Sequence, residues 1–282
     1  MPKFKTLILF SSSEIGGAEK SLSRLALKGE HNEFILGSLS GDGVLLQSKI
    51  NIKSKVYKFG FKKPSFIKLI LSSIRALIFS KKHSVDFIYI CGFKACTIIR
   101  IISILISTPK IIHAIRWNPK SNNKDDRIFR KLEKFLIFKT YGWICNSNSA
   151  KDTLVISCKI PKERIISIYN GIDIKDKIIN DNSNNTKVIL TLSNFAPRKG
   201  IIEYLNIIEK VVKINKKVIF ILAGRDDMNG MVQETIKEKK LENFVQTPGF
   251  VHNSDAILKK ADLVVLPSLL PEGCPTSILE AM

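Results

Sequence analysis

The sequence has few cysteines, and their spacing excludes several classes of protein. Five cysteines occur in 282 residues, and no two of them form a C-x-x-C pair. A disulfide-stabilised scaffold, a zinc ribbon and a thioredoxin-like redox pair are therefore not indicated. An odd number of cysteines without a secretory signal is typical of reduced thiols, which pack as small apolar residues. We therefore predict a cytoplasmic protein without a metal site.

Long apolar runs are also missing. The two best candidates for a membrane-spanning helix are residues 66–79 and 97–107, but neither reaches the ~18 apolar residues that a span needs. Charged residues interrupt both of them, at Lys68, Arg75 and Arg100. The basic N-terminus precedes an apolar run that is too short for a signal peptide, which favours a first β-strand. The sequence therefore predicts that the chain does not cross a membrane.

Positive charge is present in excess and is unevenly distributed. The formal net charge is +20. Residues 1–172 hold 30 Lys+Arg against 11 Asp+Glu, whereas residues 173–282 hold 15 against 14. A basic half beside a neutral half indicates a face that meets an anionic surface, either nucleic acid or anionic lipid.

Short β-branched and aromatic runs alternate with longer periodic runs along the whole chain. The predicted strands are residues 5–10, 33–36, 56–59, 87–90, 110–114, 143–146, 165–169, 188–192, 218–222, 244–247 and 263–266. The predicted helices between them are residues 18–28, 65–81, 95–106, 125–139, 149–157, 201–213, 231–239 and 254–260. Because parallel neighbours need a helical crossover, this alternation predicts an α/β fold with parallel sheets.

A polar, Asn-rich segment at residues 173–186 interrupts the alternation and is predicted to be a linker. We therefore expect two tandem Rossmann-like, doubly wound domains, at residues 1–172 and 187–282. A last helix is predicted to open at Gly273, and the chain stops at Met282 without a capping residue or polar tail. We expect the second domain to be incomplete and the chain to be truncated.

Two features of the first domain point to ligand chemistry. Gly16 and Gly17 lie at a strand-to-helix turn, where the backbone can approach a ligand beside a helix N-terminus. The alternative is that both glycines serve the turn alone. His113 is predicted to end a strand, with Arg116 just beyond it, where ligands of open α/β folds bind. A buried structural histidine is the alternative there.

Two segments of the second domain carry the stronger signals. Arg198 and Lys199 follow its first strand and open a helix, which suits a diphosphate, although a solvated loop is equally compatible. Glu272 and Glu280 lie eight positions apart around the start of the predicted last helix. The first carboxylate would meet a reacting sugar and the second a ribose. The backbone from Gly273 to Ser277 would offer N–H groups to a ligand.

Taken in order, these motifs resemble those of glycosyltransferase family 4, whose enzymes have the GT-B fold. The segments that carry the resemblance are Gly16–Glu19, Asn146–Ser149, Tyr169–Asp173, Ala223–Gly224, Pro248–Val251 and the E-x7-E element Glu272–Glu280. One departure is clear, because Ser193 and Asn194 stand where the family usually has Gly-Arg. That arginine normally helps to bind the diphosphate, and Arg198 is the candidate to replace it.

The resemblance implies a retaining transferase that moves a sugar from a nucleotide diphosphate sugar to a lipid-linked glycan, without a metal or another cofactor. The donor would bind mainly to the second domain and the acceptor to the first. The implied catalytic residues are Glu272 and His113. The donor-binding residues would be Arg198, Lys199, Gly273, Cys274, Pro275, Thr276 and Glu280, and the backbone of Gly16 and Gly17 would approach the sugar or phosphate.

Two other functions remain open from the sequence. The chain could be a truncated, inactive relic of such an enzyme. It could also be a basic nucleic-acid-binding α/β protein, although no nucleic-acid-binding motif is present. For the transferase we expect bacterial surface polysaccharide synthesis at the inner face of the cytoplasmic membrane. Residues 61–83, which mix apolar and basic side chains, would lie in the headgroup region or else cover the sheet.

Overall fold

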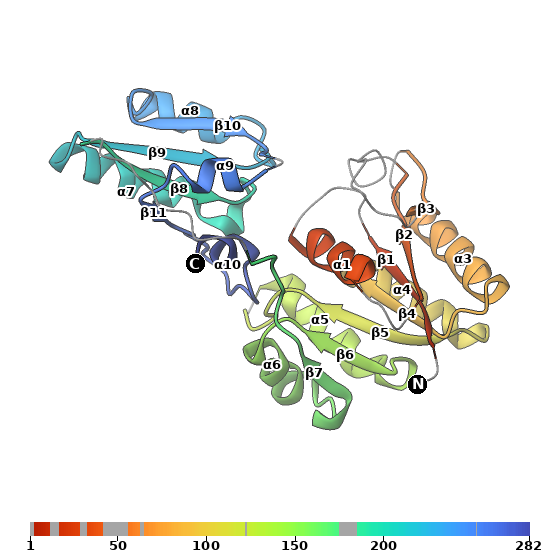
Figure 1. The fold of residues 1–282 in the computed structure, drawn as a ribbon. Coiled ribbons are helices and arrows are strands. Elements are labelled where there is room, and N and C mark those ends of the chain that lie inside the picture. The colour runs from red at the N-terminus through yellow and green to blue at the C-terminus, as the bar shows by residue number, and fades with distance from the viewer. Residues whose placement is uncertain are drawn as a thin grey trace. The chain divides into compact units, whose positions relative to one another are not determined.

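In the computed structural model, the chain divides into two compact units, Met1–Gly171 and Ile172–Met282 (Figure 1). The structure describes residues 3–11, 17–28, 33–41, 56–62, 65–121, 123–174, 185–251 and 253–282. Each unit has its own parallel sheet and its own hydrophobic core.

The first unit is built on seven parallel strands in the order β3-β2-β1-β4-β5-β6-β7. They are β1 (Lys5–Phe10), β2 (Glu33–Ser38), β3 (Val56–Lys58), β4 (Phe87–Cys91), β5 (Lys110–Ile115), β6 (Gly142–Cys145) and β7 (Ile165–Ser167). Leu7 and Leu9 point into one core, and Ile8 and Phe10 into another. Both faces of the sheet are therefore covered, which explains why its strands are apolar throughout.

Helices pack on both faces of this sheet (Figure 1). They are α1 (Gly17–Lys28), α3 (Phe66–Lys82), α4 (Phe93–Leu105), α5 (Lys124–Phe135) and α6 (Asn148–Cys158), with the 3-10 turns η1 (Ile137–Lys139) and η2 (Lys162–Arg164). Ser65, Asn123 and Ser147 cap three of the helices by accepting a backbone N–H bond. Helix α1 joins the core of Ile8, whereas α3 and α4 join the core of Leu7.

The second unit has four parallel strands in the order β10-β9-β8-β11. They are β8 (Lys187–Leu192), β9 (Val218–Ala223), β10 (Val245–Gly249) and β11 (Leu263–Val264). The helical elements are η3 (Pro197–Lys199), α7 (Ile201–Ile214), α8 (Met231–Glu238), α9 (Asp255–Leu258) and α10 (Thr276–Ala281). The amphipathic helix α7 buries Leu205 and Ile208 against the sheet.

The predicted α/β fold class with parallel sheets is confirmed. One element is corrected, because α10 begins at Thr276 and not at Gly273. Pro275 explains the difference: the residue before a proline is disfavoured in the helical region, so the helix starts beyond it. Within the described part of the chain, no helix is long and apolar enough to cross a bilayer.

Candidate active site

Two loops of the second unit meet at the carboxylate of Glu272. Lys199 Nζ donates a 2.6 Å hydrogen bond to Glu272 Oε1, and Ser268 Oγ donates another of 2.6 Å to the same oxygen. Arg198 Nη1 lies 3.5 Å from it. Among the described residues, Glu272 Oε2 accepts no hydrogen bond. We call these four residues the Lys199–Glu272 centre, in which one carboxylate oxygen is held and the other is left for a ligand.

Backbone contacts hold the two loops together. Lys199 and Glu272 are 73 positions apart in the sequence. Leu269 N donates a 3.0 Å hydrogen bond to Arg198 O, which ties one loop to the other. Gly200 follows with a φ of +65°, and a Cβ placed there would lie 2.3 Å from Pro267 O. Only glycine permits this turn and this approach, so Gly200 allows the centre to form.

Burial and charge act together at the Lys199–Glu272 centre. Burial lowers the pKa of Lys199, although the hydrogen bond and charge of Glu272 oppose that effect. Burial alone would raise the pKa of Glu272, but the hydrogen bonds from Lys199 and Ser268 and the nearby cations lower it overall. Glu272 is therefore ionised at neutral pH. Two cations around one carboxylate leave a net positive charge, which suits an anionic ligand such as a diphosphate.

The second acid of the motif has a different partner. Glu280 lies on α10, and Ser254 Oγ donates a 3.0 Å hydrogen bond to its Oε2. The residues between the two acids, 273–279, are all partly exposed, and the first three of them precede the helix. Glu272 and Glu280 therefore sit in separate polar settings of the second unit. Ser254 and Ser268 were not singled out from the sequence, because a lone serine in a loop carries no local signal.

Ser193 and Asn194, which replace the usual Gly-Arg of the family, lie beside the loop after β9. Asn194 Oδ1 accepts a 3.2 Å hydrogen bond from Arg225 N, so this side chain braces a neighbouring loop. Arg225 itself pairs with Asp227, with contacts of 2.6 and 3.1 Å. Arg198 is largely exposed and close to Glu272. Its role as a replacement for the missing arginine stays a prediction.

His113 does not end its strand, and that expectation is wrong. Strand β5 continues to Ile115, and the His113 side chain is completely buried. Ala114 and the β-branched Ile115 continue the strand beyond His113, one residue past the predicted range of 110–114. A catalytic role for His113 stays a prediction, and its position favours a structural role.

His113 belongs to a buried ionic cluster with Glu133 and Arg100. Arg100 Nη1 and Trp143 Nε1 donate hydrogen bonds of 3.0 and 2.6 Å to Glu133 Oε2. His113 Nδ1 lies 3.1 Å from Glu133 Oε1. Burial would lower the pKa of His113, but Cys96 and Glu133 raise it to about 9. Burial would raise the pKa of Glu133, but His113 and Arg100 lower it to about 2. The cluster is therefore charged and closed to solvent.

Arg116, and not His113, lies at the carboxyl end of β5. Its Nη1 donates a 2.6 Å hydrogen bond to Asn170 Oδ1, and its Nη2 donates a 3.3 Å hydrogen bond to the Tyr89 hydroxyl oxygen. Neither partner carries a negative charge at neutral pH, since burial raises the pKa of Tyr89 to about 12. The sequence predicted Arg116 just beyond the carboxyl end of this strand, where the structure has it.

The remaining predicted residues are only partly within the described structure. Gly17 is the first residue of α1, where helix N–H groups lack intrahelical partners. Gly16 lies outside the described residues. Near this helix, Ser21 Oγ donates a 3.2 Å hydrogen bond to Asn170 Oδ1. In the part of the chain that the structure describes, no three His, Cys, Asp or Glu side chains gather as a metal site, and all five cysteines are free.

Known proteins match both halves of the chain. The family model "Glycosyltransferase Family 4" matches residues 15–176, and "Glycosyl transferases group 1" matches residues 173–282. The poly(ribitol-phosphate) alpha-N-acetylglucosaminyltransferase of Staphylococcus aureus is 28% identical over 171 residues, which cover 60% of this chain and 34% of that protein. The phosphatidylinositol N-acetylglucosaminyltransferase GPI3 subunit of Saccharomyces cerevisiae is 27% identical over 170 residues, covering 57% and 37%. The chain thus matches about a third of the length of these relatives.

Solved structures resemble nearly the whole chain. HepE of Anabaena, in complex with UDP and glucose, has a TM-score of 0.77 at 23% identity and covers 99% of this chain and 78% of its own. A glycosyltransferase of Rickettsia africae has a TM-score of 0.69 at 18% identity and covers 100% and 77%. These likenesses establish the GT-B fold. The family 4 model matches more than half of the residues of this chain, and the chain therefore belongs to glycosyltransferase family 4.

Proposed function

We propose that this protein transfers a sugar, with retention of configuration, from a nucleotide diphosphate sugar to a lipid-linked glycan acceptor. The observation that carries the proposal is the Lys199–Glu272 centre, in the segment that matches the "Glycosyl transferases group 1" model. It offers fixed cations, a held carboxylate and an oxygen free to accept a bond. A reaction in which a diphosphate leaves needs such preorganised cations.

The residue roles in this proposal are those that the family resemblance implies, and the contacts at the Lys199–Glu272 centre support them in part. Glu272 would accept a hydrogen bond from a hydroxyl of the donor sugar through Oε2, while Lys199 and Ser268 hold Oε1 in place. Lys199 and Arg198 would stabilise the diphosphate as its bond to the sugar breaks. Glu280 would contact the ribose, and the backbone of residues 273–276 would line the donor site. Gly17, with Gly16, would approach the transferring sugar or phosphate from the first domain.

Two names among the relatives guide the choice of substrate. The Staphylococcus aureus and Saccharomyces cerevisiae relatives are named as N-acetylglucosaminyltransferases, and HepE was crystallised with UDP and glucose. We therefore place UDP-N-acetylglucosamine first and UDP-glucose second among the donors. Bacterial surface polysaccharide synthesis is the proposed setting, as in the poly(ribitol-phosphate) relative.

Helix α3 supports attachment to a membrane. It buries Ser72, Ser73 and Ser80, whose hydroxyls donate to carbonyls of their own helix. It also buries Ala76 and Leu77 in the core, but it exposes four large apolar side chains: Phe66 (71%), Ile67 (70%), Leu71 (45%) and Ile78 (62%). A helix that only covered the sheet would turn its largest apolar residues inward. The exposed apolar stripe and the basic first domain fit reversible binding to an anionic leaflet.

The test is a donor screen with the purified protein. UDP-N-acetylglucosamine should be consumed and UDP released only when a glycan acceptor is present, and the Glu272→Ala variant should lack this activity. Binding of UDP without any turnover would favour the inactive relic. Binding of nucleic acid in preference to UDP would favour the third alternative.

A further inference from the structure

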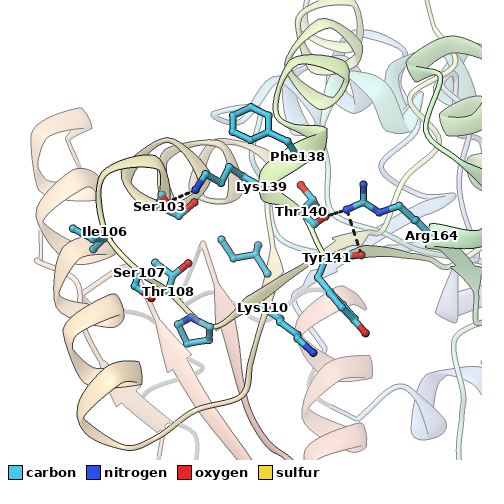
Figure 2. A pocket seen from close by; sticks show the side chains of 12 residues that line it. Ser103, Ile106, Ser107, Thr108, Lys110, Phe138, Lys139, Thr140, Tyr141 and Arg164 are labelled. Carbon is cyan, nitrogen blue, oxygen red and sulfur yellow. Dashed lines mark hydrogen bonds between the residues drawn. The ribbon is translucent and has the colours of Figure 1, made fainter.

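A pocket lies on the first unit at the edge where its strands begin (Figure 2). Its volume is about 410 Å³. Lys110 is the first residue of β5, Tyr141 directly precedes β6, and Arg164 directly precedes β7. Amino ends of parallel strands share one edge of a sheet, so the pocket lies at the edge opposite Arg116. It therefore lies apart from the carboxyl edge, where the transfer reaction is proposed.

The lining of this pocket carries positive charge and hydroxyl groups but no carboxylate. Its basic residues are Lys110, Lys139 and Arg164, and Ser107, Thr108 and other hydroxyls lie between them. Lys139 Nζ donates a 2.8 Å hydrogen bond to Ser103 O, and Arg164 donates to the carbonyls of Thr140 and Tyr141 (Figure 2). These partners are neutral.

Lys110 is also held by neutral groups. Its Nζ lies 4.7 Å from the ring centre of Tyr141 and 5.5 Å from that of Phe87. None of the three cations lies within ion-pair distance of a carboxylate in the described structure. Three basic residues thus line one pocket, and none of them is paired with a carboxylate of the described residues. A phosphate group would accept hydrogen bonds from them and balance their charge.

Large exposed apolar side chains line the pocket or lie at the ends of the helices that lead into it. Leu105 at the end of α4 is 86% exposed, and Phe135 at the end of α5 is 69% exposed. Ile106 and Phe138, which line the pocket itself, are 43% and 60% exposed. Free phosphate would leave these side chains in water, whereas the headgroup region of a bilayer would cover them. The combination of cations inside and apolar groups around favours a lipid phosphate.

We propose that this pocket binds the phosphate of an anionic phospholipid and anchors the first domain to the membrane surface. The proposal rests on the membrane attachment proposed above and specifies which lipid group is bound and by which residues. Lys110, Lys139 and Arg164 would contact the phosphate, and Leu105, Ile106 and Phe138 would enter the headgroup region.

The experiment is sedimentation of the full chain with vesicles of phosphatidylcholine, with and without phosphatidylglycerol. The test variant is Lys110→Gln/Lys139→Gln. Each lost lysine should weaken binding to anionic vesicles about fivefold, and the pair roughly 25-fold. The matched control is Lys94→Gln/Lys120→Gln, which removes two exposed lysines of the same unit, one of them at the opposite end of α4. The control should weaken binding much less.

A second variant, Leu105→Asn, tests the contribution of the exposed apolar side chains. Leu105→Asn should weaken binding to anionic vesicles but leave binding of inorganic phosphate unchanged. Equal vesicle binding by the wild type and the Lys110→Gln/Lys139→Gln variant would overturn the proposal. The proposal would also be overturned if the Lys110→Gln/Lys139→Gln variant no longer bound inorganic phosphate but still bound vesicles as the wild type does. The pocket would then be a site for free phosphate. UDP binding should be the same in the wild type and in these variants, because the proposed donor site lies on the second unit. A failure of the transferase proposal would therefore be detected independently of the vesicle result.

Discussion

The two units contain the same chemical arrangement, a carboxylate held by two cations, in opposite settings. Glu133 is completely buried, and both of its oxygens accept hydrogen bonds or charge contacts from Arg100, His113 and Trp143. Glu272 is 22% exposed, and among the described residues only its Oε1 accepts hydrogen bonds. The Glu133 cluster is closed to solvent, so a ligand does not reach it. The comparison therefore separates an ionic cluster that stabilises the fold from one that is open to chemistry.

The largest effect is expected from Glu133→Ala. The change leaves Arg100 and the charged His113 buried without an anionic partner, which typically costs about 3–5 kcal/mol of stability. Both tryptophans of the chain, Trp117 and Trp143, lie in the first unit, so their fluorescence follows that unit alone during urea unfolding.

Glu33→Gln is the matched control for Glu133→Ala. It removes one charge from a 3.4 Å ion pair with Lys5 at the surface of the same unit. Such exposed pairs contribute at most about 1 kcal/mol, so the unfolding midpoint should hardly move. Similar midpoints for the two variants would show that the buried cluster contributes little.

The next effect concerns Glu272→Ala. Loss of one preorganised polar contact of this kind lowers the rate about 10²–10³-fold. The thermal midpoint should stay close to that of the wild type, because Glu272 is partly exposed and lies on a loop. Sugar transfer and thermal unfolding are measured on the same preparation. Turnover at the wild-type rate would remove Glu272 from the site.

The sequence predicted the elements well but not the contacts that build the sites. Apolar runs such as Lys5–Phe10 carry a local signal, so β1 was predicted at its observed bounds. The meeting of Lys199 with Glu272 depends on loops 73 positions apart, which no local pattern encodes. Glu133 lies on the amphipathic α5, and the sequence carries no local signal that this charged residue is buried. Its burial became clear only from the partners around it.

A smaller effect is expected from Lys199→Ala. A charge-assisted hydrogen bond to phosphate contributes roughly 1.5–3 kcal/mol, so UDP should bind about tenfold or more weakly. The loss of Lys199 should also raise the pKa of Glu272, since Lys199 helps to lower it. Titration calorimetry with UDP measures the affinity, and Lys213→Ala, at an exposed lysine of the same unit, is the control. Unchanged affinity would make Lys199 a surface residue.

The last prediction concerns the pH dependence of stability, which should come from His113 and change by a small amount with each pH unit. Its pKa is raised from 6.5 to about 9 in the folded protein, so its stabilising contribution is complete below the unfolded value. Between roughly pH 6.5 and 9 the first unit should lose about 1 kcal/mol of stability for each pH unit. His113→Asn should flatten this part of the profile. The same slope in wild type and variant would mean that His113 is neutral in the folded state.

The contrast between the two carboxylates is tested most directly by amide hydrogen exchange of the full chain, with and without UDP-N-acetylglucosamine. The donor should slow exchange at residues 197–200 and 268–280, around the Lys199–Glu272 centre. Exchange around Arg100, Glu133 and Trp143 should not change, because that cluster is completely buried and closed to solvent. Protection confined to the first unit, with none around Lys199 and Glu272, would contradict the account.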